Sequence, residues 1–249
     1  MSRKREELRA GGIPEAELRQ RAETARHDRR DFAAALRVNR PAVISEIKRA
    51  SPSKGVLLEN FRPVELAKQY EKGGASALSV LTDRDFFQGS LADLCAARSA
   101  CMLPVIRKDF TISEYHVLEA AAHGADAILL IVALLDAKQL RAFRELAAEF
   151  RMAALVEVHD RRELDAAIAS GAEVIGVNNR DLRTFHVSLQ TSIALAQHIP
   201  SGVVKVSESG IFSQQDVRRL MDSGYDAFLV GEHLVKSGDP AQALRELVA

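Results

Sequence analysis

Short apolar runs recur along most of the chain, and most of them end on a polar or charged residue. Amphipathic stretches separate the runs, and a glycine followed by a small residue often precedes the next run, as expected where a helix ends. Such a repeat of strand and helix predicts parallel strands joined by crossover helices. The eight candidate strands start near Val43, Ala77, Pro104, Ala127, Ala154, Val174, Val203 and Ala227.

Eight repeats of this kind fit either a closed (β/α)8 barrel or an open doubly wound sheet. The length of 249 residues is about that of a single barrel. No G-x-G-x-x-G sequence opens a helix, so the dinucleotide fingerprint of many doubly wound sheets is missing. We therefore predict an α/β protein with a single (β/α)8 TIM barrel at residues 41–249.

The first forty residues contain no candidate strand, and we interpret residues 1–40 as a helical extension packed on the barrel. Asp31 is the expected N-cap of a short helix that begins at Phe32. We expect the part near Phe32 and Leu36 to dock and the charged start, residues 3–9, to fray. A flexible tail is the alternative for the whole extension.

Composition narrows the class of partner. Lysine plus arginine and aspartate plus glutamate both number 34, so the net charge is zero. Binding to a nucleic-acid backbone needs a basic surface, whereas a phosphorylated small molecule needs only a few local donors. Two cysteines, no signal-like start and no apolar run of membrane-spanning length lead us to expect a cytoplasmic protein with no membrane or nucleic-acid partner. We expect a monomer.

Charged side chains stand at the ends of several runs. The first run ends on Lys48, with Glu46 two residues earlier, the third ends on Lys108 and the fifth on Glu157. Residues i and i+2 of a strand share a face, so Glu46 and Lys48 should point the same way. Strand ends of a barrel meet at its catalytic face, which predicts two lysines and two carboxylates able to exchange protons there. A salt-bridge network that only plugs the barrel is the alternative.

Glycines follow the last two runs. Ser209 and Gly210 follow the seventh run, and Gly231 and Glu232 follow the eighth. In many barrels these two loops bind a phosphate through backbone N–H groups, and glycine lets the backbone approach the anion closely. We predict a phosphate site here, with ordinary turns as the alternative.

Other residues beyond the strand ends have two interpretations each. Residues 51–55, Ser-Pro-Ser-Lys-Gly, suit a mobile loop that folds over a ligand, or a plain surface loop. Phe87 and Phe110 could form the wall of an aromatic pocket or cap the core. Asn178 and Arg180 could contact a carboxylate or hydroxyl, although Arg180 could instead pair with the aspartate that follows it.

Two common kinds of catalytic site are missing from the sequence. The seven histidines form no H-E-x-x-H and no compact group with carboxylates, so we predict no metal site. No G-x-S-x-G elbow is present either, which argues against a serine hydrolase.

Several segments, taken together, resemble the indole-3-glycerol phosphate synthase family. The segments containing Lys48 and Lys108 are highly specific, whereas the glycine motifs are shared with other phosphate-binding barrels. The matching segments, in order within a match from about Asp31 to the C-terminus, are SEIKRASPSKG at 45–55, LSVLTD at 78–83, FFQGS at 86–90, LPVIRKDF at 103–110, GADAILLI at 124–131, LVEVH at 155–159, IGVNNRDL at 175–182, VSESGI at 206–211 and DAFLVGE at 226–232.

The resemblance implies an activity and residue roles. The family converts 1-(2-carboxyphenylamino)-1-deoxyribulose 5-phosphate to indole-3-glycerol phosphate, releasing carbon dioxide and water, with no metal or organic cofactor. By resemblance, Lys108 is the general acid, Glu157 the general base of the dehydration, and Lys48 with Glu46 a supporting pair. The resemblance also implies substrate contacts at Ser51, Phe87, Phe110, Asn178, Arg180, Glu208 and Ser209, and a phosphate region at Ser209, Gly210, Gly231 and Glu232.

One expectation concerns the acidity of the proposed general acid. A partly buried, positively biased site should let the Lys108 ammonium give up its proton more readily than the free lysine pKa of about 10.4 suggests. At Glu232 we expect the backbone N–H, rather than the carboxylate, to contact the phosphate.

The residues alone leave two alternative functions. A phosphoribosylanthranilate isomerase would use a Cys/Asp or Asp/Asp pair at strand ends, whereas the ends here carry lysine and glutamate, and both cysteines fall in a predicted helix. A catalytically silent barrel that only binds a phosphorylated metabolite or a partner protein would have no need of all four ionisable residues.

Overall fold

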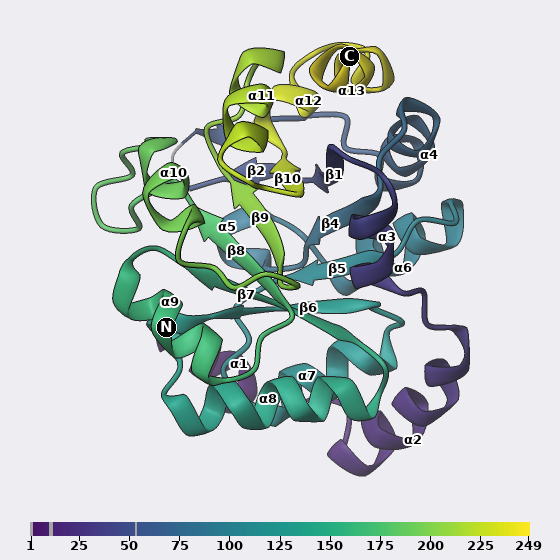
Figure 1. Cartoon of the computed structure of the whole chain (residues 1–249). Coiled ribbons are helices and arrows are strands. Elements are labelled where there is room, and N and C mark those ends of the chain that lie inside the picture. Colours follow the sequence, from purple (N-terminus) through teal and green to yellow (C-terminus); the bar gives the residue numbers. More distant parts are fainter. Residues whose placement is uncertain (1, 10–11, 53) are drawn as a thin grey trace.

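A computed structural model describes residues 2–9, 12–52 and 54–249 (Figure 1). Eight parallel strands close into a barrel with helices around it, which confirms the predicted (β/α)8 fold. Each strand begins within one residue of its predicted start. The barrel strands are β1 (Ala42–Ile47), β4 (Ala77–Leu81), β5 (Val105–Lys108), β6 (Ala127–Ile131), β7 (Ala153–Val158), β8 (Val174–Asn178), β9 (Val204–Glu208) and β10 (Ala227–Val230), hydrogen-bonded in the order β1-β10-β9-β8-β7-β6-β5-β4.

Helices connect consecutive strands and pack around the barrel. Several begin at a serine or aspartate whose side chain accepts a backbone N–H of the first turn, as at Ser90, Asp160 and Ser213. These capping residues fix where the loop ends and the helix begins. In the described ranges, no helix has the length and apolar character needed to cross a membrane. The helices after β1 are α4 (Pro63–Gly73), α5 (Arg84–Phe87), α6 (Leu91–Ala100), α7 (Glu114–Ala122), η2 (Val132–Leu134), α8 (Ala137–Glu149), α9 (Arg161–Ala169), α10 (Gln190–Ala196), α11 (Gln214–Asp222), α12 (Glu232–Val235) and α13 (Pro240–Val248).

Apolar side chains form two layers, one inside the barrel and one between the strands and the helices. Successive residues of β5 show why: Ile106 belongs to the inner layer, while Val105 belongs to the outer one. Arg107 lies on the outer face, where it is 5% exposed and pairs with Asp109 and Glu119. The inner face therefore carries Lys108 toward the open end of the barrel.

Helix α3 (Phe32–Val38) closes the opposite end of the barrel. Phe32 and Leu36 are buried in the same apolar cluster as Ala42 and Ala77, the first residues of β1 and β4. The Asp31 side chain accepts the Ala34 N–H at 2.8 Å, which confirms the predicted cap. Docking of this segment is confirmed, and the flexible-tail alternative is wrong here because two large apolar side chains fill the barrel floor.

The charged start of the chain is also helical. Residues 2–9 form α1 (Ser2–Arg9), followed by α2 (Glu15–Ala25), which packs along α7, and by η1 (Arg26–Asp28) (Figure 1). Fraying of residues 3–9 was the expectation, and it is wrong. Lys4 is only 5% exposed because its ammonium meets carboxylates from distant loops.

A short hairpin stands where a loop was predicted after β1. The two strands, β2 (Ala50–Ser51) and β3 (Gly55–Val56), pair antiparallel. Gly55 has a φ of 67°, a left-handed conformation that favours glycine and permits the tight reversal. Residue 53, within the predicted mobile loop, lies outside the described residues.

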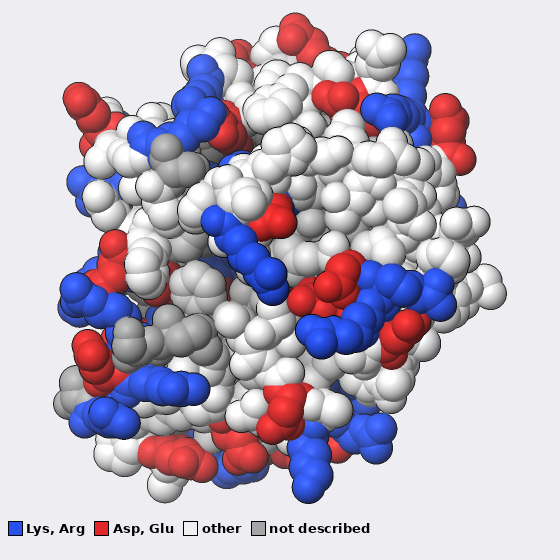
Figure 2. All heavy atoms as spheres, turned by 90° about the vertical axis from the view of Figure 1, so that its left-hand side faces the viewer, with Lys and Arg blue, Asp and Glu red and all other residues white. Residues whose placement is uncertain are grey.

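Charged side chains are interspersed on the surface. On the face drawn in Figure 2, Lys and Arg alternate with Asp and Glu and form no continuous basic stripe. This distribution matches the zero net charge of the sequence and differs from the basic footprint of a nucleic-acid-binding face.

Asp126 ties three separate segments together. It is fully buried between α7 and β6, and it accepts the backbone N–H groups of Arg30 and Val105, each at 2.9 Å. The Arg98 guanidinium from α6 donates to both of its carboxylate oxygens, at 3.0 and 3.2 Å. One carboxylate thus joins the N-terminal extension, a barrel strand and an outer helix.

We expect Asp126→Ala to lower the free energy of unfolding by about 3–5 kcal/mol, because it leaves Arg98 and two N–H groups without their acceptor. Equilibrium urea unfolding measures this change. Glu145→Ala on the exposed face of α8 is the matched control, expected to change stability by less than about 0.5 kcal/mol. A loss below about 1 kcal/mol for Asp126→Ala would contradict the proposed linkage.

Candidate active site

A cavity of about 460 Å³ opens at the C-terminal ends of the barrel strands. Its apolar lining includes Leu129, Ile131 and Leu229, and its polar lining comes from the strand ends and the loops that follow them. The structure brings together here every residue that the sequence analysis selected: Glu46, Lys48, Ser51, Phe87, Lys108, Phe110, Glu157, Asn178, Arg180, Glu208, Ser209, Gly210, Gly231 and Glu232.

Lys108 lies at the centre of the charged group. Its Nζ is 3.0 Å from Glu208 Oε2 and 3.3 Å from Glu157 Oε2, and both carboxylates are almost completely buried. The three side chains come from β5, β9 and β7, which meet only because the barrel closes. Glu208 was predicted to contact the substrate, but its place beside Lys108 was not predicted. Its position at the end of the seventh run was the available signal.

Glu46 and Lys48 form the second ion pair. Lys48 Nζ lies 2.6 Å from Glu46 Oε1, so the two side chains share a face of β1 as predicted. Together with Glu157 and Glu208, Glu46 makes three carboxylates against two lysines. The immediate surroundings of Lys108 are therefore negative, rather than positive as we expected.

The two carboxyl groups beside Lys108 have very different pKa values. Burial alone would raise the pKa of Glu157, but Lys108, His159 and the Asn178 amide outweigh it and lower that pKa to about 2. Burial raises the pKa of Glu208 to about 7, because Lys108 offsets only part of the desolvation and Glu157 adds repulsion. Glu157 is thus an anion at neutral pH, while Glu208 exchanges its proton near neutrality.

The neighbouring carboxylates also shift the pKa of Lys108, in the direction opposite to the one we expected. Burial by itself would lower its pKa, but Glu208, Glu157 and Glu46 together raise it above the ordinary lysine value. The prediction that Lys108 releases its proton readily is therefore wrong for the ligand-free site. Lys108 remains an ammonium throughout the neutral range, so it is present in its acid form whenever a ligand arrives.

His159 is a member of the site that the sequence analysis quoted but gave no role. Its Nε2 lies 3.4 Å from Glu157 Oε1, and its Nδ1 lies 3.0 Å from Glu163 Oε2 in the first turn of α9. Burial alone would lower its pKa, but the two carboxylates raise it to about 10. His159 therefore places a further cation beside Glu157, and its position two residues beyond Glu157 was the signal for this.

Aromatic rings line the side of the cavity near β4 and β5. The rings of Phe86 and Phe110 lie edge to face with centroids 6.2 Å apart, and Phe87 lines the cavity beside them. Phe86 is 42% exposed, so these rings form an open wall rather than a cap of the core. Phe87 and Phe110 were predicted to form this wall, whereas no role was predicted for Phe86.

The loops after β9 and β10 form the opposite side of the cavity. Ser209 and Gly210 both have positive φ values, 70° and 78°, and a Cβ at Gly210 would crowd Val187. Gly231 directly precedes α12, and the Glu232 carboxylate is engaged with Lys54 at 2.6 Å and Lys236 at 2.9 Å. An anion between these loops would therefore meet backbone groups rather than a free carboxylate.

Asn178 and Arg180 occupy the loop after β8. The Asn178 amide donates to Glu157 Oε1 at 3.2 Å, and Arg180 lines the cavity half-buried. The aspartate after Arg180 instead accepts the backbone N–H groups of Arg183 and Thr184, which favours the cavity over the surface ion pair for Arg180.

Comparison with known proteins decides the family. The indole-3-glycerol phosphate synthase family model matches residues 1–247. The synthase of Aromatoleum aromaticum is 50% identical over 253 residues, covering 99% of this chain and 96% of the relative. The chain belongs to the indole-3-glycerol phosphate synthase family. The synthase of Chromobacterium violaceum is 52% identical over 238 residues, covering 94% of this chain and 89% of that relative.

More distant solved structures share only the fold of this indole-3-glycerol phosphate synthase family member. A mutant tryptophan synthase alpha-subunit from Pyrococcus furiosus superposes with a TM-score of 0.64 at 13% identity, covering 83% of this chain and 97% of that chain. A thiamine phosphate pyrophosphorylase from Pyrococcus furiosus gives 0.62 at 18% identity, covering 83% and 93%.

Gly176 on β8 tests the geometry of the charged group. A Cβ at this position would collide with Glu208 Oε1 and press on Leu155. We expect Gly176→Ala to displace the Glu208 carboxylate from Lys108 and to lower the synthase kcat/KM by up to about 100-fold, the effect of a misplacement on the order of 1 Å.

Gly202→Ala is the control for that substitution. Gly202 has a φ of 90° on a turn that does not line the cavity, so alanine there should lower stability and leave kcat/KM unchanged. Steady-state kinetics with melting curves compare the two variants. Full activity in Gly176→Ala would show that the position of Glu208 is unimportant.

Proposed function

We propose that the chain is an indole-3-glycerol phosphate synthase whose proton transfers are carried out by the group around Lys108. The observation that carries this proposal is the Lys108 ammonium between Glu157 and Glu208, in a cavity with an aromatic wall on one side and glycine loops on the other. Family membership supports the overall reaction.

The shape of the cavity supports one orientation of the substrate. Its volume of about 460 Å³ lies within the usual range for small-molecule sites. The carboxyphenyl ring would lie against Phe86 and Phe110, and the phosphate against the loops at Gly210 and Gly231. The ketone carbon between them would then lie near Lys108.

Ring closure is the first chemical step. An aromatic carbon of the substrate attacks the ketone carbon, and the ketone oxygen takes a proton from the Lys108 ammonium as the carbon–carbon bond forms. Carbon dioxide then leaves from the same aromatic carbon, and its bonding electrons restore the ring. We assign Lys48 and Glu46 to holding the substrate, and no step to a metal or an organic cofactor.

Dehydration follows, with Glu157 as the base. In the ligand-free site the pKa of Glu157 is low, chiefly because the Lys108 charge opposes burial. Once Lys108 has given its proton to the substrate, that charge is lost and the pKa of Glu157 must rise. The acid step therefore makes Glu157 more basic, and Glu157 takes a proton from the ring-closed, decarboxylated intermediate. Glu208, 3.0 Å from Lys108, is placed to return a proton to Lys108, which gives it to the departing hydroxyl so that water leaves.

The chain offers a clean assay for this proposal. It contains no tryptophan, so indole fluorescence in a reaction mixture comes from the product alone. With 1-(2-carboxyphenylamino)-1-deoxyribulose 5-phosphate, we expect indole fluorescence and one carbon dioxide per product. No product, with substrate still bound, would instead indicate a barrel that only binds a phosphorylated metabolite.

We expect Glu157→Gln to lower kcat by about 10²–10⁴-fold, the usual value of a general base, with KM little changed. Glutamine has the same shape but cannot accept a proton, so a cyclised, decarboxylated and still hydrated intermediate should accumulate. Glu173→Gln, on an exposed residue outside the cavity, is the control. If Glu157 only anchors ion pairs, its substitution will lower the melting temperature while kcat holds.

A further inference from the structure

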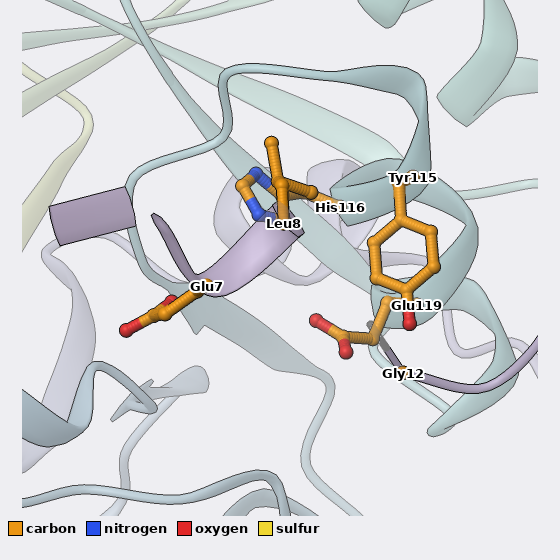
Figure 3. A pocket seen from close by; sticks show the side chains of 6 residues that line it. All are labelled: Glu7, Leu8, Gly12, Tyr115, His116 and Glu119. Atoms are coloured by element: carbon orange, nitrogen blue, oxygen red, sulfur yellow. The ribbon is translucent and has the colours of Figure 1, made fainter. Parts of the chain in front are cut away.

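Helix α1 is held in place mainly by polar contacts. Of residues 3–9, Lys4 alone is buried, and the other charged side chains lie at the surface or half-buried. A small cavity of about 90 Å³ lies where α1 and α7 face each other, so their packing there is incomplete (Figure 3). The residues that line it are Glu7, Leu8, Gly12, Tyr115, His116 and Glu119. The position of α1 must therefore depend strongly on Lys4.

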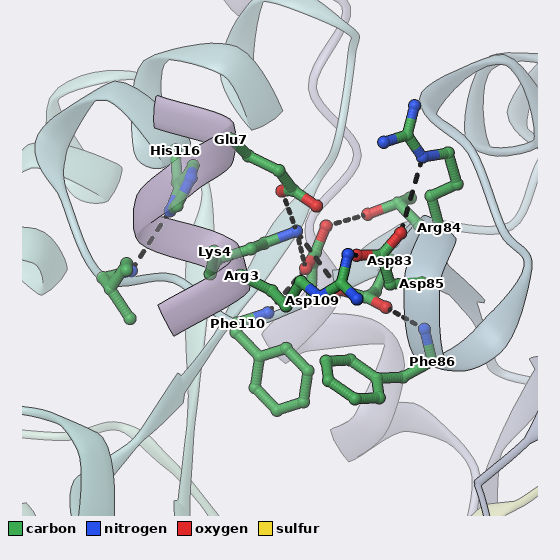
Figure 4. A network of polar contacts seen from close by, with 12 residues as sticks. Arg3, Lys4, Glu7, Asp83, Arg84, Asp85, Phe86, Asp109, Phe110 and His116 are labelled. Atoms are coloured by element: carbon green, nitrogen blue, oxygen red, sulfur yellow. Dashed lines mark hydrogen bonds and ion pairs between the residues drawn. The ribbon is translucent and has the colours of Figure 1, made fainter. Parts of the chain in front are cut away.

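The Lys4 ammonium joins two loops of the catalytic face (Figure 4). Its Nζ lies 2.7 Å from Asp109 Oδ1, 2.8 Å from Glu7 Oε2 and 3.4 Å from Asp83 Oδ2. Asp83 follows β4 and Asp109 follows β5, so one side chain from the start of the chain connects two neighbouring strand ends.

Each of these aspartates fixes part of the cavity wall. Asp83 accepts the Phe86 N–H at 2.7 Å and thereby caps α5. Asp109 stands between Lys108 and Phe110 in the chain and accepts the Phe110 N–H at 2.7 Å. In Figure 4 the rings of Phe86 and Phe110 lie together beneath the ammonium. Asp109 is thus the chain neighbour of both Lys108 and Phe110, and Asp83 precedes Phe86 by three residues.

We propose that Lys4 is a positioning residue for the reaction, whose ammonium holds the ends of β4 and β5 together and so keeps the aromatic wall and Lys108 in register. This inference rests on the proposed function.

Electrostatics explain why the ammonium is needed. Burial raises the pKa of Asp83, with Lys4 and the Phe86 N–H opposing it. Burial would also raise the pKa of Asp109, but Arg107 and Lys4 lower it to about 2. Burial by itself would lower the pKa of Lys4, but Asp109, Glu7 and Asp83 raise it. Without Lys4, two nearly buried carboxylates would face each other, and the loops would separate or Asp83 would take up a proton.

If Lys4 positions only one side of the cavity, its loss should affect binding of only one part of the substrate. The wall that Lys4 supports follows β4 and β5, whereas the loop at Gly210 follows β9, which lies opposite β5 in the barrel order. Loss of Lys4 should therefore weaken the grip on the aromatic half of the substrate and leave phosphate binding unchanged. A general loosening of the protein would weaken both.

The test compares Lys4→Met with Arg5→Met, which removes an exposed charge from the same helix. We expect Lys4→Met to lower kcat/KM by up to about 100-fold, because the wall and Lys108 are displaced on the order of 1 Å. The displaced wall should raise KM, and the displaced Lys108 should lower kcat. The inhibition constant of inorganic phosphate should stay at the wild-type value. Lys4→Arg should recover part of the loss, and Arg5→Met should resemble the wild type.

Three results would overturn the inference: wild-type kinetics in Lys4→Met, an equal loss of phosphate binding, or a kinetic defect that disappears when the assay is cooled below the melting transition. Should Lys4→Met not fold, Lys4→Gln removes the charge while keeping a hydrogen-bonding group, and the same criteria apply. An inactive wild type would refute the proposed function instead, since the comparison needs wild-type turnover.

Discussion

The ion pairs of Lys108 with Glu157 and Glu208 are the interaction on which the site depends. The central group consists of Glu46, Glu157, Glu208 and two lysines, and the ammonium of Lys108 holds the carboxyl groups of Glu157 and Glu208 close together. Because the pairs are buried, their mutual attraction is strong and removal of one partner is costly. The same attraction sets the protonation state of each group before a ligand binds.

The rest of the fold serves to bring these side chains to one end. Phe32 and Leu36 fill the floor, and the cavity lies at the strand ends that carry charge. The register of β9 against β8 places Glu208 opposite Asn178, which in turn holds Glu157. Gly176 leaves room for the Glu208 carboxylate. A site with so many buried charges can persist only where each has a partner built into the scaffold.

Much of this arrangement could be predicted from the sequence. The alternation of strand and helix gave the strand starts to within one residue, and the i, i+2 rule placed Glu46 beside Lys48. Nearness of Lys108 to Glu208 could not be predicted in the same way, because it depends on which strands face each other after closure. The sign of the Lys108 pKa shift was missed for that reason, since it requires counting every charge in the mouth.

The N-terminal helix shows a second limit. Charge in residues 3–9 suggested fraying, yet the partners of Lys4 lie 79 and 105 residues away, after β4 and β5. No local pattern identifies such partners. The hairpin after β1 was missed because two-residue strands leave no periodic signal, although Gly55 marks its turn.

The rate of ring closure in Lys108→Met, measured as carbon dioxide release in a single turnover, tests the central claim most directly. Methionine keeps much of the side-chain volume but has no proton to give. With a native melting curve, the rate should fall by about 10²–10⁴-fold, the usual value of a general acid. A variant that folds and closes the ring at a near wild-type rate would contradict the assignment of Lys108 as the acid.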